Sequence, residues 1–321
     1  MTVPTAQPTP DDPVEDLTAE PAAAVVLGDA ASYVPRAELR ARVLAAATAA
    51  RAPGGPGGGP GPMSPADAFL RTQADLAALV EDLSDSDARS ITIEGWTVAG
   101  LLGHLTAIEQ HFGAQLGWWA EPGPIELEHD HLAMTLDAVR SAETGPFDEV
   151  RNRWRDVVHQ VTDRLDSLEG RHTERLMFNG FDFSIRSLII VRTFEVWTHT
   201  EDICRATGRS QRIVDPARLR LMSDAAVRAL PIGMLLADRP PRGRTVRIVL
   251  TGEGGGAWVQ SLELGDAPAG TNEPELTLTA SAIEFCRLAA RRTAAGDLDC
   301  SIVGDSDLAA DVLAAAAVFA A

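Results

Sequence analysis

The segment at residues 184–206, SIRSLIIVRTFEVWTHTEDICRA, constrains the fold of this chain more than any other part of the sequence. Most of it is apolar or β-branched, which is typical of a helix that is buried on most of its sides. Four of its polar residues lie at spacings of three, four and three residues: Arg192, Glu195, His199 and Asp202. With about 3.6 residues per turn, these spacings place all four on one stripe of a helix. Because buried polar groups need partners, we expect the stripe to face an interior cavity.

Two residues of this stripe have the spacing by which a helix presents two ligands to one metal ion. Glu195 and His199 are four positions apart, so their side chains lie one turn apart on the same face. A catalytic zinc ion typically takes about three protein ligands and keeps one position open. His104, which lies among leucines on another helical segment, is the candidate for the third ligand. We therefore predict a metal site formed by His104, Glu195 and His199.

Simpler interpretations of these residues remain open. A histidine in apolar surroundings is more often a hydrogen-bonded core residue than a ligand, and Glu and His at this spacing often form only a surface pair. Weaker candidates are His111, the HDH sequence at 129–131, the GEGGG sequence at 252–256 and Cys204. We interpret them as a packed polar residue, a solvated loop, a turn and a core thiol, respectively.

Changes in composition divide the chain into three parts. Residues 1–63 begin as an acidic tail, contain one possible helix at 36–51 and end in a Gly/Pro linker, so we expect them to lie outside the core. Residues 64–212 contain four helical segments, which predict an antiparallel four-helix bundle. Residues 213–321 combine helices with strand-like alternation and predict a small α+β domain with an antiparallel sheet. The predicted fold class is α+β.

The expected elements follow from apolar periodicity and from capping and breaking residues. In the bundle, we expect helices at 65–83, 98–119, 147–168 and 183–207. In the C-terminal part, we expect a helix at 215–237, strands at 245–252, 257–264 and 275–281, a helix at 282–292, a short strand at 299–304 and a closing helix at 307–320.

Composition limits the possible partners and the compartment. The formal net charge is −18, and all 28 basic residues are arginine, which argues against nucleic acid or an anionic membrane as the main partner. The three cysteines are widely separated and form no CxxC motif, which favours a reducing, cytoplasmic location. Neither a secretory signal nor an apolar run long enough to span a bilayer is evident.

Two helical segments resemble a known family. The segment GWTVAGLLGHLTAIE at 95–109 and the segment FDFSIRSLIIVRTFEVWTHTEDICRATG at 181–208 resemble the signatures of the mycothiol-dependent maleylpyruvate isomerase family, a branch of the DinB-like helical bundles. RTVRIVLTGEGGGAWV at 244–259, with the later LAARR, resembles the sterol-carrier-like C-terminal domain of that family. The resemblance covers residues 64–321. The lead-in ITIEGWT lacks the Pro and Cys that are common there, which leaves the substrate open.

The resemblance implies both a site and a chemistry. It places the metal ligands at His104, Glu195 and His199, and a basic residue directed toward the substrate at Arg291, with Arg292 as the second choice. It implies a divalent metal, with zinc expected, and mycothiol as a thiol cosubstrate that adds as a thiolate to a small electrophile. The net reaction is isomerisation if the thiol leaves and S-transfer if it stays. Arg192 either pairs with a substrate carboxylate or supports Glu195.

Two other classes of function are compatible with the sequence. A non-catalytic binding or regulatory protein could retain the metal-binding bundle and dock a protein partner through residues 1–63. A lipid carrier is a further alternative, suggested by the C-terminal part alone, but it leaves the polar stripe without a role. Asp202 is expected either to orient His199 or to face solvent.

Overall fold

The computed structural model describes residues 63–119, 131–178, 181–241, 243–264 and 273–317. All of them belong to one unit of the chain, Pro35–Ala321. The predicted tail helix at 36–51, most of the Gly/Pro linker and the first two residues of the HDH sequence lie outside the described residues.

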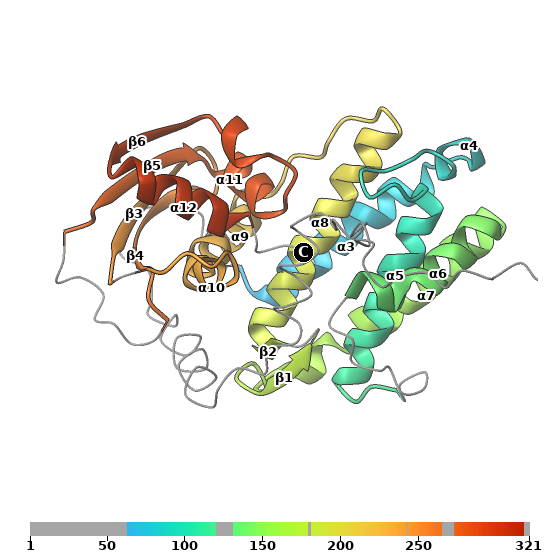
Figure 1. Ribbon diagram of the computed structural model, residues 1–321. Helices are drawn as coiled ribbons and strands as arrows, with labels where there is room; N and C mark the ends of the chain where they lie inside the picture. The colour runs from blue at the N-terminus through green and yellow to red at the C-terminus, as the bar shows by residue number, and fades with distance from the viewer. Residues whose placement is uncertain (1–62, 120–130, 179–180, 242, 265–272, 318–321) are drawn as a thin grey trace, which may run out of the picture. The chain divides into compact units, whose positions relative to one another are not determined.

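The four predicted helices are present, and the predicted α+β fold is confirmed. They are α3 (Pro65–Glu81), α5 (Val98–Gln115), α7 (Phe147–Thr162) and α8 (Ile185–Ala206). Figure 1 shows them packed together, with α3 against α8 and α5 against α7. Shorter elements lie between them: α4 (Asp85–Ala88), the 3-10 helix η1 (Leu165–Leu168), and the antiparallel strands β1 (Arg175–Phe178) and β2 (Phe181–Ser184).

Local capping explains where α3, α5 and α8 begin. Ser64 accepts a hydrogen bond from the backbone N–H of Asp67 at 3.0 Å, and Pro65 occupies the first helical position, where no N–H is needed. Thr97 caps α5 in the same way, and Ser184 caps α8. The start of α8, and therefore the position of its polar stripe, is fixed by this serine.

One bundle helix was not predicted. α6 (His131–Thr144) packs along α5 at very short range. A Cβ atom added at Gly103 would lie 2.6 Å from the carbonyl oxygen of Ala138 and 2.7 Å from Cβ of Ala142. The small residues Ala138 and Ala142 allow this close approach. Leu132, Leu136 and Val139 lie at i, i+4 and i+7, a helical signal that the sequence reasoning did not use.

The C-terminal elements follow the predicted order, with two corrections. They are α9 (Pro216–Arg228), α10 (Leu230–Leu236), β3 (Thr245–Thr251), β4 (Gly256–Ser261), β5 (Leu276–Ser281), α11 (Ala282–Ala289), the 3-10 helix η2 (Ala295–Asp297), β6 (Cys300–Gly304) and α12 (Ser306–Ala316). The helix predicted at 215–237 is divided into α9 and α10, because Pro231 lies in the first turn of α10 and cannot continue a hydrogen-bonded ladder. The GEGGG sequence forms the predicted turn between β3 and β4.

The second correction concerns the sheet, which is mixed. Its strand order is β4-β3-β5-β6, and β3 pairs with β5 in parallel, whereas β3–β4 and β5–β6 are antiparallel. The chain leaves β4 and returns on the far side of β3, so β5 runs in the direction of β3 and not against it. Leu276, Leu278 and Ala280 of β5 are buried, and α11 and α12 pack over this face (Figure 1). None of the described helices is both long enough and apolar enough to cross a bilayer.

We expect Gly103→Ala to destabilise the protein by about 1–3 kcal/mol, because the added methyl overlaps the backbone of α6. Urea unfolding followed by circular dichroism measures the change. Gly296→Ala is the matched control, since a Cβ atom there meets no atom within 4 Å. Equal stabilities for the two variants would contradict the close packing of α5 and α6.

Candidate metal centre

The structure brings the three predicted ligands together. One ligand atom from each of His104, Glu195 and His199 lies within 4.8 Å of the others. His104 projects from α5, and the other two project from α8. His104 and His199 are buried, Glu195 is partly buried, and Nε2 of His104 lies 3.1 Å from Oε1 of Glu195. Two imidazoles and a carboxylate at this range form a donor set that suits a divalent metal.

The second ring nitrogen of each histidine already has a partner. Nδ1 of His104 lies 2.8 Å from the hydroxyl of Thr135 on α6, and Nδ1 of His199 lies 3.2 Å from Oδ2 of Asp202. Metal-ligating histidines usually have this arrangement, because a hydrogen bond at one nitrogen fixes the ring and its tautomer. Nε2 of His104 faces Glu195, the third predicted ligand, so the residues present fit the predicted ion.

A buried ion network lies behind Glu195. Arg192 is fully buried; it donates to Oε2 of Glu195 and, at 2.8 Å, to Oε1 of Glu109 on α5. Gln73 of α3 donates to the same oxygen of Glu109 at 2.8 Å. Burial raises the pKa of Glu109, although Arg192 counteracts the effect. Burial also disfavours the charge on Arg192, but Glu109 and Glu195 outweigh it and raise the pKa of the arginine.

This network assigns Arg192 a position that the sequence left open. Its guanidinium is buried between two carboxylates, so it supports Glu195 and does not lie at a surface that a substrate carboxylate could reach. Of the two positions that the sequence left open for Arg192, the pair with Glu195 is the one that the structure shows.

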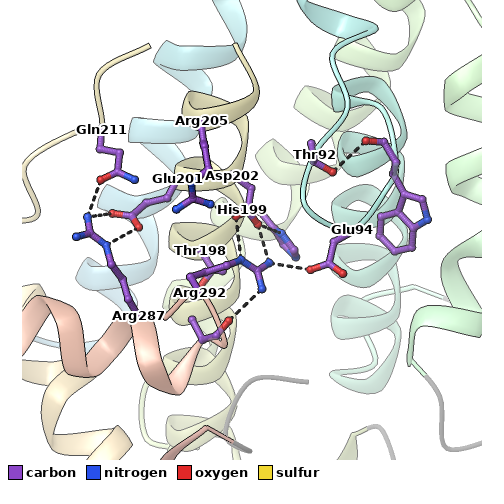
Figure 2. Close-up of polar contacts among 12 residues, drawn as sticks. Thr92, Glu94, Thr198, His199, Glu201, Asp202, Arg205, Gln211, Arg287 and Arg292 are labelled. Carbon is purple, nitrogen blue, oxygen red and sulfur yellow. Dashed lines mark hydrogen bonds and ion pairs between the residues drawn. The ribbon is translucent and has the colours of Figure 1, made fainter. Parts of the chain in front are cut away.

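Asp202 is bound on its other side by an arginine from the C-terminal part of the chain. Arg292 donates from Nε to Oδ1 at 2.9 Å and from Nη2 to Oδ2 at 2.6 Å, and it also reaches Glu94 at 2.8 Å (Figure 2). Burial alone would raise the pKa of Asp202, but hydrogen bonds from His199 and Arg292 outweigh it and lower that pKa. A charged Asp202 is a suitable partner for a neutral His199 that donates from Nδ1.

The structure does not bring Arg291 to this cluster. Arg291 is exposed and has a left-handed backbone, with φ of 57°. The amide of Arg292 donates to the carbonyl of Arg287 at 2.8 Å, and the amide of Arg291 donates to that of Leu288 at 2.9 Å. These two bonds form a Schellman motif at the end of α11, which turns the chain so that Arg292 reaches Asp202. Of the two arginines that the resemblance offered, Arg292, the second choice, is the one that contacts the cluster.

Other candidates lie apart from the cluster. His111 is buried against Phe178, with ring centroids 5.0 Å apart. Cys204 is buried, and burial raises the pKa of its thiol, as expected of a core cysteine. Sequence reasoning missed Thr135, Glu109 and Gln73. Glu109 is the one acidic residue of α5, and this was a signal that it could be the partner of a buried arginine such as Arg192.

Comparisons with known proteins agree with this geometry. Two uncharacterized proteins of Mycobacterium tuberculosis, Rv0036c and MT0041, are each 30% identical over 260 residues, which is 77% of this chain and 91% of theirs. The family model of the DinB superfamily matches residues 68–203, a range that includes the three predicted ligands. The chain belongs to the same family as these two mycobacterial proteins, and its residues 68–203 form a DinB-superfamily domain. The resemblance noted in the two helical segments is confirmed at the level of this superfamily.

A solved structure has a similar fold over most of the chain. A crystal structure of a variant of the mycothiol-dependent maleylpyruvate isomerase matches with a TM-score of 0.50 and 15% identity. The match covers 74% of this chain and 91% of that one. At this identity, the likeness shows a shared fold.

We expect Arg192→Met to destabilise the metal-free protein by about 3–5 kcal/mol, because Glu109 would remain buried without its cation. Denaturant unfolding measures the loss. Adding Glu109→Leu to the same chain should recover part of it, since no buried charge is then left unpaired. Arg171→Met, which breaks an exposed pair with Glu174, is the control and should change stability by less than about 1 kcal/mol.

We also expect Arg291→Gly to be more stable than Arg291→Ala by about 0.5–1 kcal/mol. Both changes remove the guanidinium, but only glycine adopts a left-handed backbone without a steric cost. Parallel urea titrations of the two variants make the comparison. An alanine variant that matches or exceeds the glycine variant would contradict the left-handed turn after α11.

Proposed function

We propose that this protein is a metal-dependent enzyme that uses a low-molecular-weight thiol, of the isomerase or S-transferase type. His104, Glu195 and His199 would hold a divalent metal, with zinc the expected ion. The observation that carries the proposal is the convergence of these three residues, with both Nδ1 atoms already hydrogen-bonded. The shared fold with the mycothiol-dependent maleylpyruvate isomerase supports the choice of mycothiol as the thiol.

A bound metal at this site would supply Lewis acidity, which favours the thiolate form of a thiol that coordinates to it. The protein's residues supply orientation. Arg192 holds one oxygen of Glu195, which leaves the other beside His104. Asp202 fixes His199 by accepting from its Nδ1. Such fixed donors bind without first having to reorganise, which is the contribution expected of an enzyme site.

The reaction class that follows is addition of a thiolate to an activated double bond. The sulfur forms a bond to one carbon, and the electron pair of the double bond moves toward the activating carbonyl. Rotation about the new single bond, followed by loss of the thiolate, gives cis–trans isomerisation. Protonation at carbon with retention of sulfur gives an S-conjugate. The substrate is therefore a small electrophile, and the resemblance to the family favours one that bears a carboxylate.

Metal content tests the site directly. We expect about one zinc per chain in the purified full-length protein by elemental mass spectrometry, and its loss in His104→Ala and His199→Ala. His159→Ala is the matched control, because that histidine is exposed and pairs only with Asp163 on the surface. It should retain the metal at the wild-type level.

Turnover separates the enzyme from a binding protein. The zinc-loaded protein is assayed with mycothiol and maleylpyruvate, and then with a panel of carboxylate-bearing electrophiles. Thiol-dependent conversion that His199→Ala abolishes supports the proposal. Full metal occupancy without conversion of any member of the panel would favour the non-catalytic alternative, and no metal in the wild type would exclude the proposed chemistry.

A further inference from the structure

Two consecutive residues of α8 each pair with an arginine from the same short segment of the C-terminal part. Arg292 binds Asp202, as described above. One position earlier, Glu201 accepts from Nε of Arg287 at 3.0 Å and from Nη2 at 2.8 Å (Figure 2). Glu201 is buried. A two-point pair between a guanidinium and a carboxylate fixes both the direction and the distance of its partners.

The guanidinium of Arg287 makes two further hydrogen bonds. Nη1 donates to Glu284 on its own helix at 2.5 Å, and Nη2 donates to Gln211 in the segment between α8 and α9 at 2.6 Å. The hydrogen bonds that Arg287 donates to Glu201 are the main reason that the pKa of this arginine is raised. Its guanidinium thus connects α11, α8 and the segment that joins the two parts of the chain.

The backbone of Arg287 is tied to the metal centre by a second route. Its carbonyl accepts from the amide of Arg292 at 2.8 Å and from that of Thr293 at 3.3 Å. The side chain of Arg287 therefore fixes α11 on Glu201, while its carbonyl fixes the turn that carries Arg292. Arg292 then binds Asp202, and Asp202 holds His199.

We propose that Arg287 is a positioning residue for the metal centre, acting through Glu201, the turn after α11, Arg292 and Asp202 on His199. The inference rests on the proposed metal site, because it assigns a residue to that site's support. It is a statement about metal affinity, and it can be tested without knowledge of the substrate.

A simpler role would be to tie the two parts of the chain together. Arg218 of α9 is the matched comparison, since it donates to Thr72 at 3.0 Å and to Asp75 at 2.7 Å, both on α3. It is also buried and joins the same two parts, but its bonds do not lead to Asp202. Loss of Arg218 should lower stability alone, whereas loss of Arg287 should also weaken metal binding.

The experiment measures zinc affinity of the full-length protein by competition with a chromogenic chelator, at a temperature where every variant is folded. Arg287→Gln is expected to bind zinc roughly fivefold more weakly than wild type, which is in the range for a residue that acts through others. Glu201→Gln should do the same, and the double variant should be no weaker than the weaker single variant, since both remove one pathway. Arg218→Gln should bind as wild type does.

Cobalt provides a second readout. The visible spectrum of the Co²⁺-loaded protein reports ligand geometry, so it should change in Arg287→Gln and stay unchanged in Arg218→Gln. Arg287→Lys covers the case in which the glutamine variant does not fold. It keeps the charge, loses the fork, and should give a smaller shift in the same direction.

The outcomes are distinct. Wild-type zinc affinity in both Arg287→Gln and Arg287→Lys overturns the inference and leaves the proposed function intact. An equal loss in Arg218→Gln also overturns it, because the effect is then one of general stability. Absence of zinc binding by the wild type itself overturns the proposed function, and the inference with it.

Discussion

A guanidinium stays charged in any protein environment, so burying one in a helical bundle obliges the surrounding helices to supply carboxylates. Arg192 imposes this requirement on the core of the present fold. Glu109 of α5 and Glu195 of α8 supply these carboxylates. One ion network therefore fixes the two helices relative to each other. It also divides the carboxylate of Glu195 between two tasks, one oxygen for Arg192 and the other beside His104. The candidate metal centre is thus a consequence of how the charge of Arg192 is compensated.

Helix α8 contributes residues to two hydrophobic cores. Val196 and Ile203 of α8 lie in the cluster formed by the bundle, whereas Phe194 and Trp197 lie in the cluster formed mainly by the sheet and its helices. The polar stripe occupies the remaining face. Because close packing on both apolar faces restricts translation and rotation of α8, the stripe has little freedom to move. The arginines that reach Glu201 and Asp202 from the α11 segment therefore meet a helix that is already fixed.

Local sequence signals made the three metal ligands predictable. The residues that hydrogen-bond to the ligands depend on long-range contacts, so they could not be predicted. The spacing of Glu195 and His199 and the leucine-rich surroundings of His104 can be read from short windows of sequence. Thr135 could not be assigned, because its contact with His104 joins segments that are 31 residues apart in the sequence. The choice between two adjacent arginines after α11 depends on one left-handed backbone angle, to which a non-glycine sequence gives no clue.

A His…Glu-x-x-x-His pattern specifies only the atoms that approach the metal, and a hydrogen bond at the opposite nitrogen affects how strongly each imidazole donates. Here a hydroxyl holds one ring and a charged carboxylate holds the other. That carboxylate is in turn neutralised by Arg292. A chain that kept the three ligands but lost the acid or its arginine would present a less fixed His199. Ligand spacing alone therefore indicates where a metal binds, whereas the residues behind the ligands determine what the bound metal can do.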